Sequence, residues 1–129
     1  MQTPPDTVHA RLAQHADLRP DAVALESAGR PPLTYAGLRG LVDSSIDVLN
    51  RAGAGRGDCV AIVLPHTPEL ATACLAVSAC AAAAPLNPDY RETEFEFQFD
   101  SLAPKLVILP AGRSSAAREV AQARGIPIV

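Results

Sequence analysis

Apolar segments and turn signals alternate along the chain in a way that predicts strands and helices in regular succession. Apolar residues at helical spacing predict a short amphipathic helix over residues 8–16. Residues 22–26 are a strand candidate, and the turn cluster at residues 29–32 leads into residues 33–35. This order predicts a hairpin or an edge strand after the first helix.

A longer amphipathic pattern begins at Thr34. Thr34 can cap a helix at its start, and Gly53 can take the left-handed conformation that ends it. The apolar stripe of this helix consists of Leu38, Leu41, Val42, Ser45, Ile46 and Leu49.

Six consecutive apolar residues at positions 59–64 predict a strand covered on both faces. A second helix then begins with Thr67 as its cap and Glu69 in its first turn, near the positive end of the helix dipole. It runs to about Ala83, and because its residues are nearly all small or apolar, we expect most of its circumference to be covered by protein. Residues 84–87 follow as a short strand or strand end.

Residues 92–100 carry two conflicting periods. Phe95, Phe97 and Phe99 alternate with polar residues, as in a strand, but Phe95, Phe99 and Leu102 also share one helical face. The position between two expected strands calls for a crossover helix, so we predict a helix. In that helix Phe97 is partly exposed or packs on a neighbour.

The rest of the chain continues the same alternation. Residues 105–109 predict a strand, residues 113–124 a helix ended by Gly125, and residues 126–129 one more strand. Strand, helix and strand in succession, with short connections, indicate an α/β fold: an open, largely parallel sheet with helices on both faces. Because the sequence stops directly after an apolar strand, we expect it to be cut off there.

Composition narrows the class of protein. The 129 residues suit one domain, and 48% hydrophobic and 19% charged residues with a net charge of −3 exclude a disordered acidic tail and a basic nucleic-acid arm. No apolar stretch is long enough to span a bilayer, and the first residues lack the pattern of a secretory signal, so we predict a cytoplasmic protein. The cysteines Cys59, Cys74 and Cys80 show no C-x-x-C spacing and are interpreted as core residues.

Several tempting motifs do not carry chemistry. The glycine-rich stretch at residues 52–57 closes a helix and feeds a strand, whereas a phosphate-binding loop follows a strand and opens a helix, so we interpret it as a helix end and turn. The only lysine, Lys105, begins a strand and is expected to be solvated, so no Walker loop can be assembled. His9 and His15 lie six positions apart, cannot share a metal ion, and are predicted to be surface residues.

Two segments lie where open α/β sheets place ligands, directly after a strand. His66 precedes a helix start there, although a turn histidine on the rim is the favoured alternative. Asn87 and Tyr90 belong to an Asn-Pro-Asp-Tyr segment, whose residue types most often make a turn. His66, Asn87 and Tyr90 are therefore the weak candidates for substrate binding, and the residues themselves indicate no catalytic residue and no metal ligand.

Four stretches in order resemble the beginning of an adenylate-forming (AMP-binding) enzyme, a superfamily that includes acyl-CoA synthetases, aryl-CoA ligases and nonribosomal-peptide adenylation domains. The matching stretches are residues 33–38 (LTYAGL), 53–65 (GAGRGDCVAIVLP), 66–84, and 84–100 (APLNPDYRETEFEFQFD). The Asn-Pro-x-Tyr form resembles fatty-acyl or aryl-CoA ligases more than peptide synthetases. Gly37 departs from the family pattern, which has Glu there, and residues 78–81 replace a commoner Lys/Gly-containing pattern.

The resemblance implies a reaction in two halves, in which ATP and Mg²⁺ activate a small carboxylic acid as an acyl-adenylate and coenzyme A then takes the acyl group. The family's phosphate loop, acidic metal ligand, ribose-binding Asp and late catalytic Lys have no match here. Residues 1–129 thus resemble the N-terminal portion of an AMP-binding domain, truncated before the phosphate-binding loop. We expect the chain alone to bind no cofactor and to be inactive, with the remainder of its polypeptide as its partner and no nucleic acid.

Two alternatives stay open. The chain could be a self-sufficient, non-catalytic α/β binding or scaffold domain, or a fragment of a nonribosomal-peptide adenylation domain. The first predicts a monomer that unfolds cooperatively.

Overall fold

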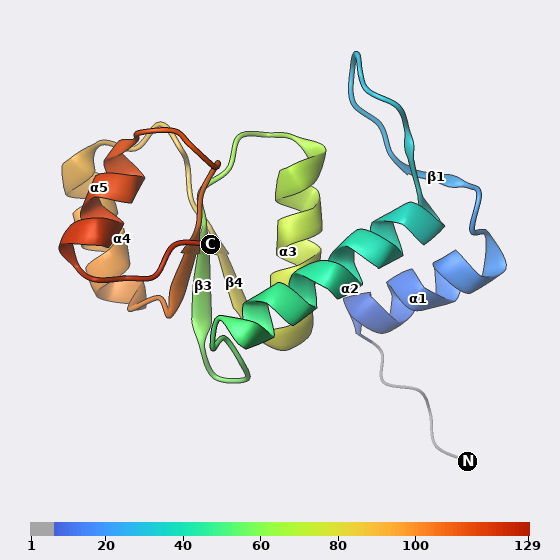
Figure 1. The fold of residues 1–129 in the computed structure, drawn as a ribbon, viewed down its shortest axis with the longest axis horizontal. Helices are drawn as coiled ribbons and strands as arrows, with labels where there is room; N and C mark the ends of the chain where they lie inside the picture. The colour runs from blue at the N-terminus through green and yellow to red at the C-terminus, as the bar shows by residue number, and fades with distance from the viewer. Residues whose placement is uncertain (1–6) are drawn as a thin grey trace.

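The computed structural model describes residues 7–129, so the first six residues of the expected domain lie outside the described part. Five helices and five strands make up this part (Figure 1). In chain order they are α1 (Val8–Leu18), β1 (Val23–Leu25), β2 (Leu33–Thr34), α2 (Tyr35–Arg51), β3 (Cys59–Ile62), α3 (Pro68–Cys80), β4 (Ala82–Pro85), α4 (Glu92–Leu102), β5 (Leu106–Ile108) and α5 (Ala116–Ala123).

A three-stranded parallel sheet lies at the centre, in the order β4-β3-β5. Helices α2 and α3 lie on one face, with α1 packed against these two helices, and α4 and α5 cover the other face (Figure 1). Strands β1 and β2 form a separate antiparallel hairpin beside α2. The predicted α/β fold, with an open and largely parallel sheet between two helical layers, is confirmed.

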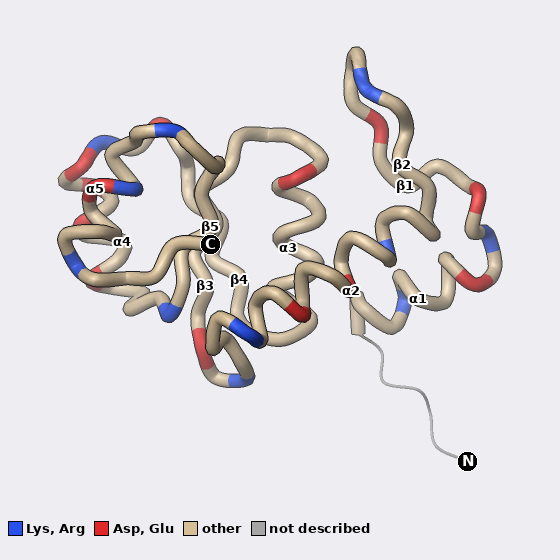
Figure 2. Tube along the Cα trace, viewed as in Figure 1, with Lys and Arg blue, Asp and Glu red and all other residues tan. Residues whose placement is uncertain are grey.

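The alternation of side chains along β3 builds two cores. Val60 and Ile62 pack with α2 and α3, whereas Ala61 and Val63 pack with α4 and α5. The strands of the sheet carry no charged residue, and Lys, Arg, Asp and Glu lie on helices and loops (Figure 2). Strand β3 is therefore the covered strand that its continuous apolar sequence predicts.

Helix α2 begins and ends as its sequence predicts. The Thr34 hydroxyl accepts a hydrogen bond of 3.1 Å from the Gly37 amide, and Gly53 lies just past the helix with a φ of +98°. Not every residue of the predicted apolar stripe, however, is buried. Leu38, Val42 and Leu49 are buried, but Leu41 is 49% exposed.

Helix α3 is shorter than expected. It ends at Cys80 instead of Ala83, because Ala81 is extended and the Ala82 amide donates to the Asp58 carbonyl at 2.9 Å. Strand β4 therefore begins at Ala82 and not at residue 84. Thr67 occupies the cap position, but its hydroxyl donates to a backbone carbonyl of the preceding turn and makes no cap bond.

Three residues of α3 are exposed, Glu69, Ser78 and Ala79, and the other ten are buried or partly buried, so the prediction that most of its circumference is covered by protein is confirmed.

The conflicting phenylalanine pattern resolves as a helix, as predicted. In α4, Phe95 and Phe99 are buried in the core under α5, and Phe97 is 70% exposed.

Two boundaries near the C-terminus differ from the prediction. Helix α5 begins at Ala116, because residue 115 takes the cap position, and residues 126–129 form a single parallel bridge to β5 instead of a full strand.

Candidate functional site

The carboxyl ends of the three parallel strands lie at one edge of the sheet. From this edge the chain leaves β3 toward α3 on one face, and leaves the neighbouring β5 toward α5 on the other face (Figure 1). Adjacent strands whose connections diverge in this way form a topological switch point, where open α/β sheets bind ligands. The switch point lies between residues 63–67 and residues 109–115.

The three candidate residues all follow strands at this edge, but the structure does not bring them into one hollow. His66 is exposed and lines a shallow hollow of about 320 Å³ between the hairpin and the start of α3. Tyr90 packs edge-on against Phe95, with ring centroids 5.7 Å apart, and lines a different hollow beside α4. The Asn87 side-chain oxygen accepts a hydrogen bond of 2.9 Å from the Asp89 amide and so makes the turn after β4.

Arg118 holds the loop after β5 in shape, a role that the sequence did not suggest. Its guanidinium donates to the carbonyls of Pro110, at 2.9 Å, and Arg113, at 2.8 Å. The Ser115 hydroxyl accepts a bond from the Arg118 amide and caps α5. The loop that forms one side of the switch point is therefore fixed by a side chain one turn inside the following helix.

The glycine-rich turn lies at the opposite edge of the sheet. Gly53 and Gly57 have positive φ angles, and the Gly55 amide donates to the Asp58 carboxylate at 2.9 Å. Lys105 is exposed at the start of β5, at this same amino edge. The interpretation of the stretch as a helix end and turn, with a solvated lysine nearby, is confirmed.

Other candidate chemistry is sparse in residues 7–129. No group of three or more His, Cys, Asp or Glu side chains there could hold a metal ion, and no helix there is long and apolar enough to cross a membrane. Burial raises the pKa of the three cysteine thiols, which fits core residues and not nucleophiles. His15 was predicted to be a surface residue, but its ring packs against the Tyr35 ring, with the two ring centroids 5.4 Å apart. Its Nδ1 atom is buried.

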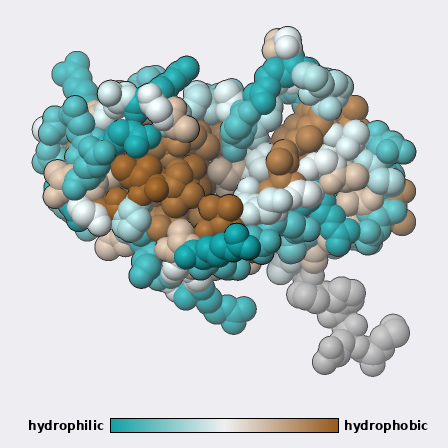
Figure 3. All heavy atoms as spheres, in the orientation of Figure 1, coloured by the Kyte–Doolittle hydropathy of each residue, from teal (hydrophilic) through white to brown (hydrophobic). Residues whose placement is uncertain are grey.

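A large apolar groove of about 750 Å³ lies between the hairpin, α2, α3 and the carboxyl end of β3. Figure 3 shows hydrophobic residues gathered on this face around the sheet, and again beside α2 and the hairpin. The side chains that form the groove walls include Leu25, Leu33, Leu41, Val48, Leu64 and Ala73.

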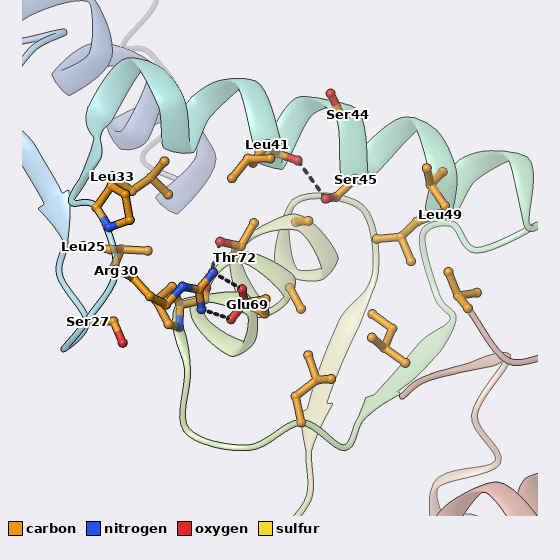
Figure 4. A pocket seen from close by; sticks show the side chains of 18 of the residues that line it. Leu25, Ser27, Arg30, Leu33, Leu41, Ser44, Ser45, Leu49, Glu69 and Thr72 are labelled. Atoms are coloured by element: carbon orange, nitrogen blue, oxygen red, sulfur yellow. Dashed lines mark hydrogen bonds and ion pairs between the residues drawn. The ribbon is translucent and has the colours of Figure 1, made fainter. Parts of the chain in front are cut away.

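Two of the polar side chains that line this groove are already bonded to their own helices. The Ser45 hydroxyl donates to the Leu41 carbonyl at 2.7 Å (Figure 4), and the Thr72 hydroxyl donates to the Pro68 carbonyl at 2.9 Å. Because these hydroxyls are satisfied within their helices, they offer little to a polar ligand. The groove walls are therefore chemically apolar.

A charged pair lies at the rim of the groove. The Arg30 guanidinium, from the loop between β1 and β2, donates two hydrogen bonds to the Glu69 carboxylate in the first turn of α3 (Figure 4). One of them joins Nη1 to Oε2 at 2.9 Å. These hydrogen bonds from Arg30 are the main reason that the pKa of Glu69 is lowered to about 2.

We expect Glu69 to stay ionised well below the usual range of glutamate. Its folded pKa lies below its unfolded value, so its contribution to stability is present above the unfolded value and is lost as the pH falls toward about 2. Side-chain carbon chemical shifts followed against pH will measure the titration. In the variant Arg30→Gln the midpoint should return toward the ordinary value, and an unchanged midpoint would contradict this account.

No sequence pattern indicates this ion pair. Arg30 and Glu69 are 39 positions apart, and each belongs to an ordinary local feature, a turn and a first helical turn. Only the approach of the hairpin to α3 brings them together.

Comparison with known proteins gives one consistent result. The family described as AMP-binding enzyme matches residues 12–128. A probable CoA ligase of Humulus lupulus, CCL9, is 41% identical over 102 residues, which are 78% of this chain and 19% of the relative. The oxalate–CoA ligase of Arabidopsis thaliana is 36% identical over 118 residues, 90% of this chain and 23% of the relative. The chain thus spans about a fifth of the length of these ligases.

A nonribosomal enzyme and solved structures match as well. The dimodular nonribosomal peptide synthase of Bacillus subtilis is 30% identical over 118 residues, 91% of this chain and 5% of that protein. The structure of ATP-bound MatB from Rhodopseudomonas palustris superposes with a TM-score of 0.81 at 26% identity, covering 93% of this chain and 24% of that one. The structure of VinN, at 23% identity, shares the fold with a TM-score of 0.83 over 94% of this chain and 30% of that one.

Proposed function

The chain belongs to the AMP-binding enzyme family, and on that premise we propose that it is the N-terminal portion of an ATP-dependent ligase of the acyl-CoA synthetase type. In the proposed reaction a carboxylate oxygen attacks the α-phosphorus of ATP and pyrophosphate leaves, which gives an acyl-adenylate. The thiol of coenzyme A then attacks the acyl carbon, AMP leaves, and a thioester forms. The partners are a small carboxylic acid and the rest of the polypeptide.

The observation that carries this proposal is the family match over residues 12–128, together with two CoA ligases that are 41% and 36% identical. The residues described here do not fit Mg²⁺ and a triphosphate. The glycine turn and Lys105 lie at the amino edge of the sheet, away from the switch point, and residues 7–129 contain no cluster of carboxylates or imidazoles for a metal. We therefore assign triphosphate binding to residues outside this chain.

Within the proposed enzyme, this portion supplies a scaffold whose carboxyl edge faces the reaction centre. Of the three candidates for substrate contact, His66 is best placed, because it is exposed at the switch point. Asn87 and Tyr90 shape the turn after β4 and would act through it. We also propose a cytoplasmic location, which suits a chain whose cysteines are all free thiols.

Carboxylate-dependent ATP/pyrophosphate exchange tests the assignment. The chain of 129 residues, supplied with Mg²⁺ and a panel of carboxylic acids, should show no exchange above a protein-free control. Measurable exchange would show that the residues for triphosphate binding lie within this chain. Reading the gene past codon 129 should reveal an in-frame glycine- and threonine-rich loop ending in lysine, and a stop codon directly there would contradict the proposal.

The second candidate is a nonribosomal-peptide adenylation domain, which the 30% identity to the dimodular nonribosomal peptide synthase supports. Both candidates share the adenylation half-reaction and differ in the thiol that accepts the acyl group. The full gene product should transfer the acyl group to coenzyme A under the first proposal, and only to a carrier protein under the second.

A further inference from the structure

The loop at the tip of the hairpin, residues 26–32, forms one wall of the apolar groove. We call it the strap. Ser27, Arg30, Pro31 and Pro32 of the strap line the groove, opposite α2 and α3 (Figure 4). Arg30 reaches from the strap to Glu69 on α3, so the strap spans from the hairpin to the helix at the rim of the groove.

The strap itself is lightly anchored. It is carried by strands of three and two residues, whose pairing register is interrupted by an irregularity. Gly29 at its tip has a φ of +75°, and a Cβ atom there would meet nothing within 4 Å. The tip and the two prolines are exposed. Short strands with an exposed connecting loop belong to the parts of a fold that open at low cost.

The contact that holds the strap to α3 is directional but weak. Two hydrogen bonds between guanidinium and carboxylate fix the orientation of Arg30 on Glu69. Both side chains are about half exposed, at 49% and 53%, so water screens the attraction between them. Such a pair therefore adds little to the free energy that keeps the strap against α3.

We propose that residues 26–32 are a strap that opens and closes over the apolar groove, and that the Arg30–Glu69 ion pair holds the closed position. In the closed position the strap shields groove walls such as Leu25 and Leu33 from water. When the pair breaks, the strap swings away from α3 and the groove opens at that rim. This device uses no group of the proposed ligase reaction and stands apart from that proposal.

Hydrogen exchange measured by mass spectrometry tests the strap directly. In Arg30→Gln and in Glu69→Gln, amides of residues 26–33 should exchange about fivefold faster than in the natural chain, since loss of an exposed pair shifts the opening equilibrium by about that factor. The charge-reversed double variant, Arg30→Glu with Glu69→Arg, should restore slow exchange. The natural chain in about 1 M NaCl, where the pair is screened, should show faster exchange in the same segment without any substitution.

The chain contains a matched control on the other face of the molecule. The Arg124 guanidinium also donates two hydrogen bonds to one carboxylate, that of Asp100, at 2.7 and 3.1 Å. This pair lies far from the groove. Arg124→Gln should therefore leave exchange of residues 26–33 unchanged. If Arg30→Gln gives natural exchange in the strap, or if the double variant stays as fast as the single ones, the proposal is overturned.

Entry of an uncharged apolar dye gives an independent measurement. N-phenyl-1-naphthylamine should associate several-fold faster with Arg30→Gln than with the natural chain, and Arg124→Gln should match the natural chain. The chain has no tryptophan, so no tryptophan emission overlaps the fluorescence of the dye. Equal association rates in all three proteins would show that the strap does not gate the groove.

Discussion

Replacing Phe95 with alanine is expected to lower the free energy of unfolding by about 3–5 kcal/mol. The Phe95 side chain is fully buried, and its ring contacts Phe99 and Tyr90, each with centroids 5.7 Å apart. Phe95 belongs to the core cluster that also contains Val107 and Leu109, so its truncation would leave a cavity within a packed core. Far-UV circular dichroism during urea unfolding will measure the loss.

The same helix supplies the control. Phe97 is 70% exposed, so Phe97→Ala should change the free energy of unfolding by no more than about 0.5 kcal/mol. The two substitutions remove the same atoms from positions two residues apart, which leaves burial as the variable. Equal losses in both variants would mean that α4 does not face the sheet as described. A strand over these residues, the rejected alternative, would make Phe95 and Phe97 share one face.

The outcome at α4 shows why part of this fold can be predicted from sequence. Residues 92–102 form a helix, as the spacing of Phe95, Phe99 and Leu102 predicts, and not the strand that the alternation of phenylalanine with polar residues would indicate. The reason is that two parallel strands, β4 and β5, need a crossover helix between them. Helix α2 was predictable for a different reason, since its apolar stripe and its Thr34 cap are local signals. The position of His66 at the carboxyl edge also follows from element order alone.

Alanine-rich and long-range features could not be predicted in the same way. Residues 81–85 are four alanines and a proline, and alanine suits a helix and a covered strand almost equally, so the end of α3 is decided by backbone pairing with β3. Thr67 has the residue type of a cap, but its hydroxyl bonds the preceding turn.

The groove could not be predicted, because it forms only where α2, α3 and the hairpin come together in the folded chain. Leu41 carries the apolar signal of a core residue, yet it is 49% exposed and lines the open groove between α2, α3 and the hairpin. The Arg30–Glu69 pair joins elements that only the folded hairpin brings together. Periodicity reports which face of a helix is apolar, and it does not report what lies against that face.

Replacing Val42 with aspartate is expected to cost at least about 4 kcal/mol and to leave most of the chain unfolded at neutral pH. Val42 has no exposed surface and packs in the core between α2, α3 and the sheet. A carboxylate there would lose its hydration without a positive partner. Val48→Asp, on the same helix at a position that is 49% exposed, should cost less than about 1 kcal/mol.

The pH dependence of Val42→Asp separates the buried charge from a simple loss of packing. Burial raises the pKa of the new carboxyl in the folded state above its unfolded value of about 3.9, so the folded state binds the proton more tightly. The free energy of unfolding of this variant should therefore rise, relative to the natural chain, as the pH is lowered from 7 toward 4. Val48→Asp should show no such recovery. If the difference between Val42→Asp and the natural chain stays constant over this range, the side chain at position 42 is hydrated in the folded protein and the core between α2 and the sheet is open to water.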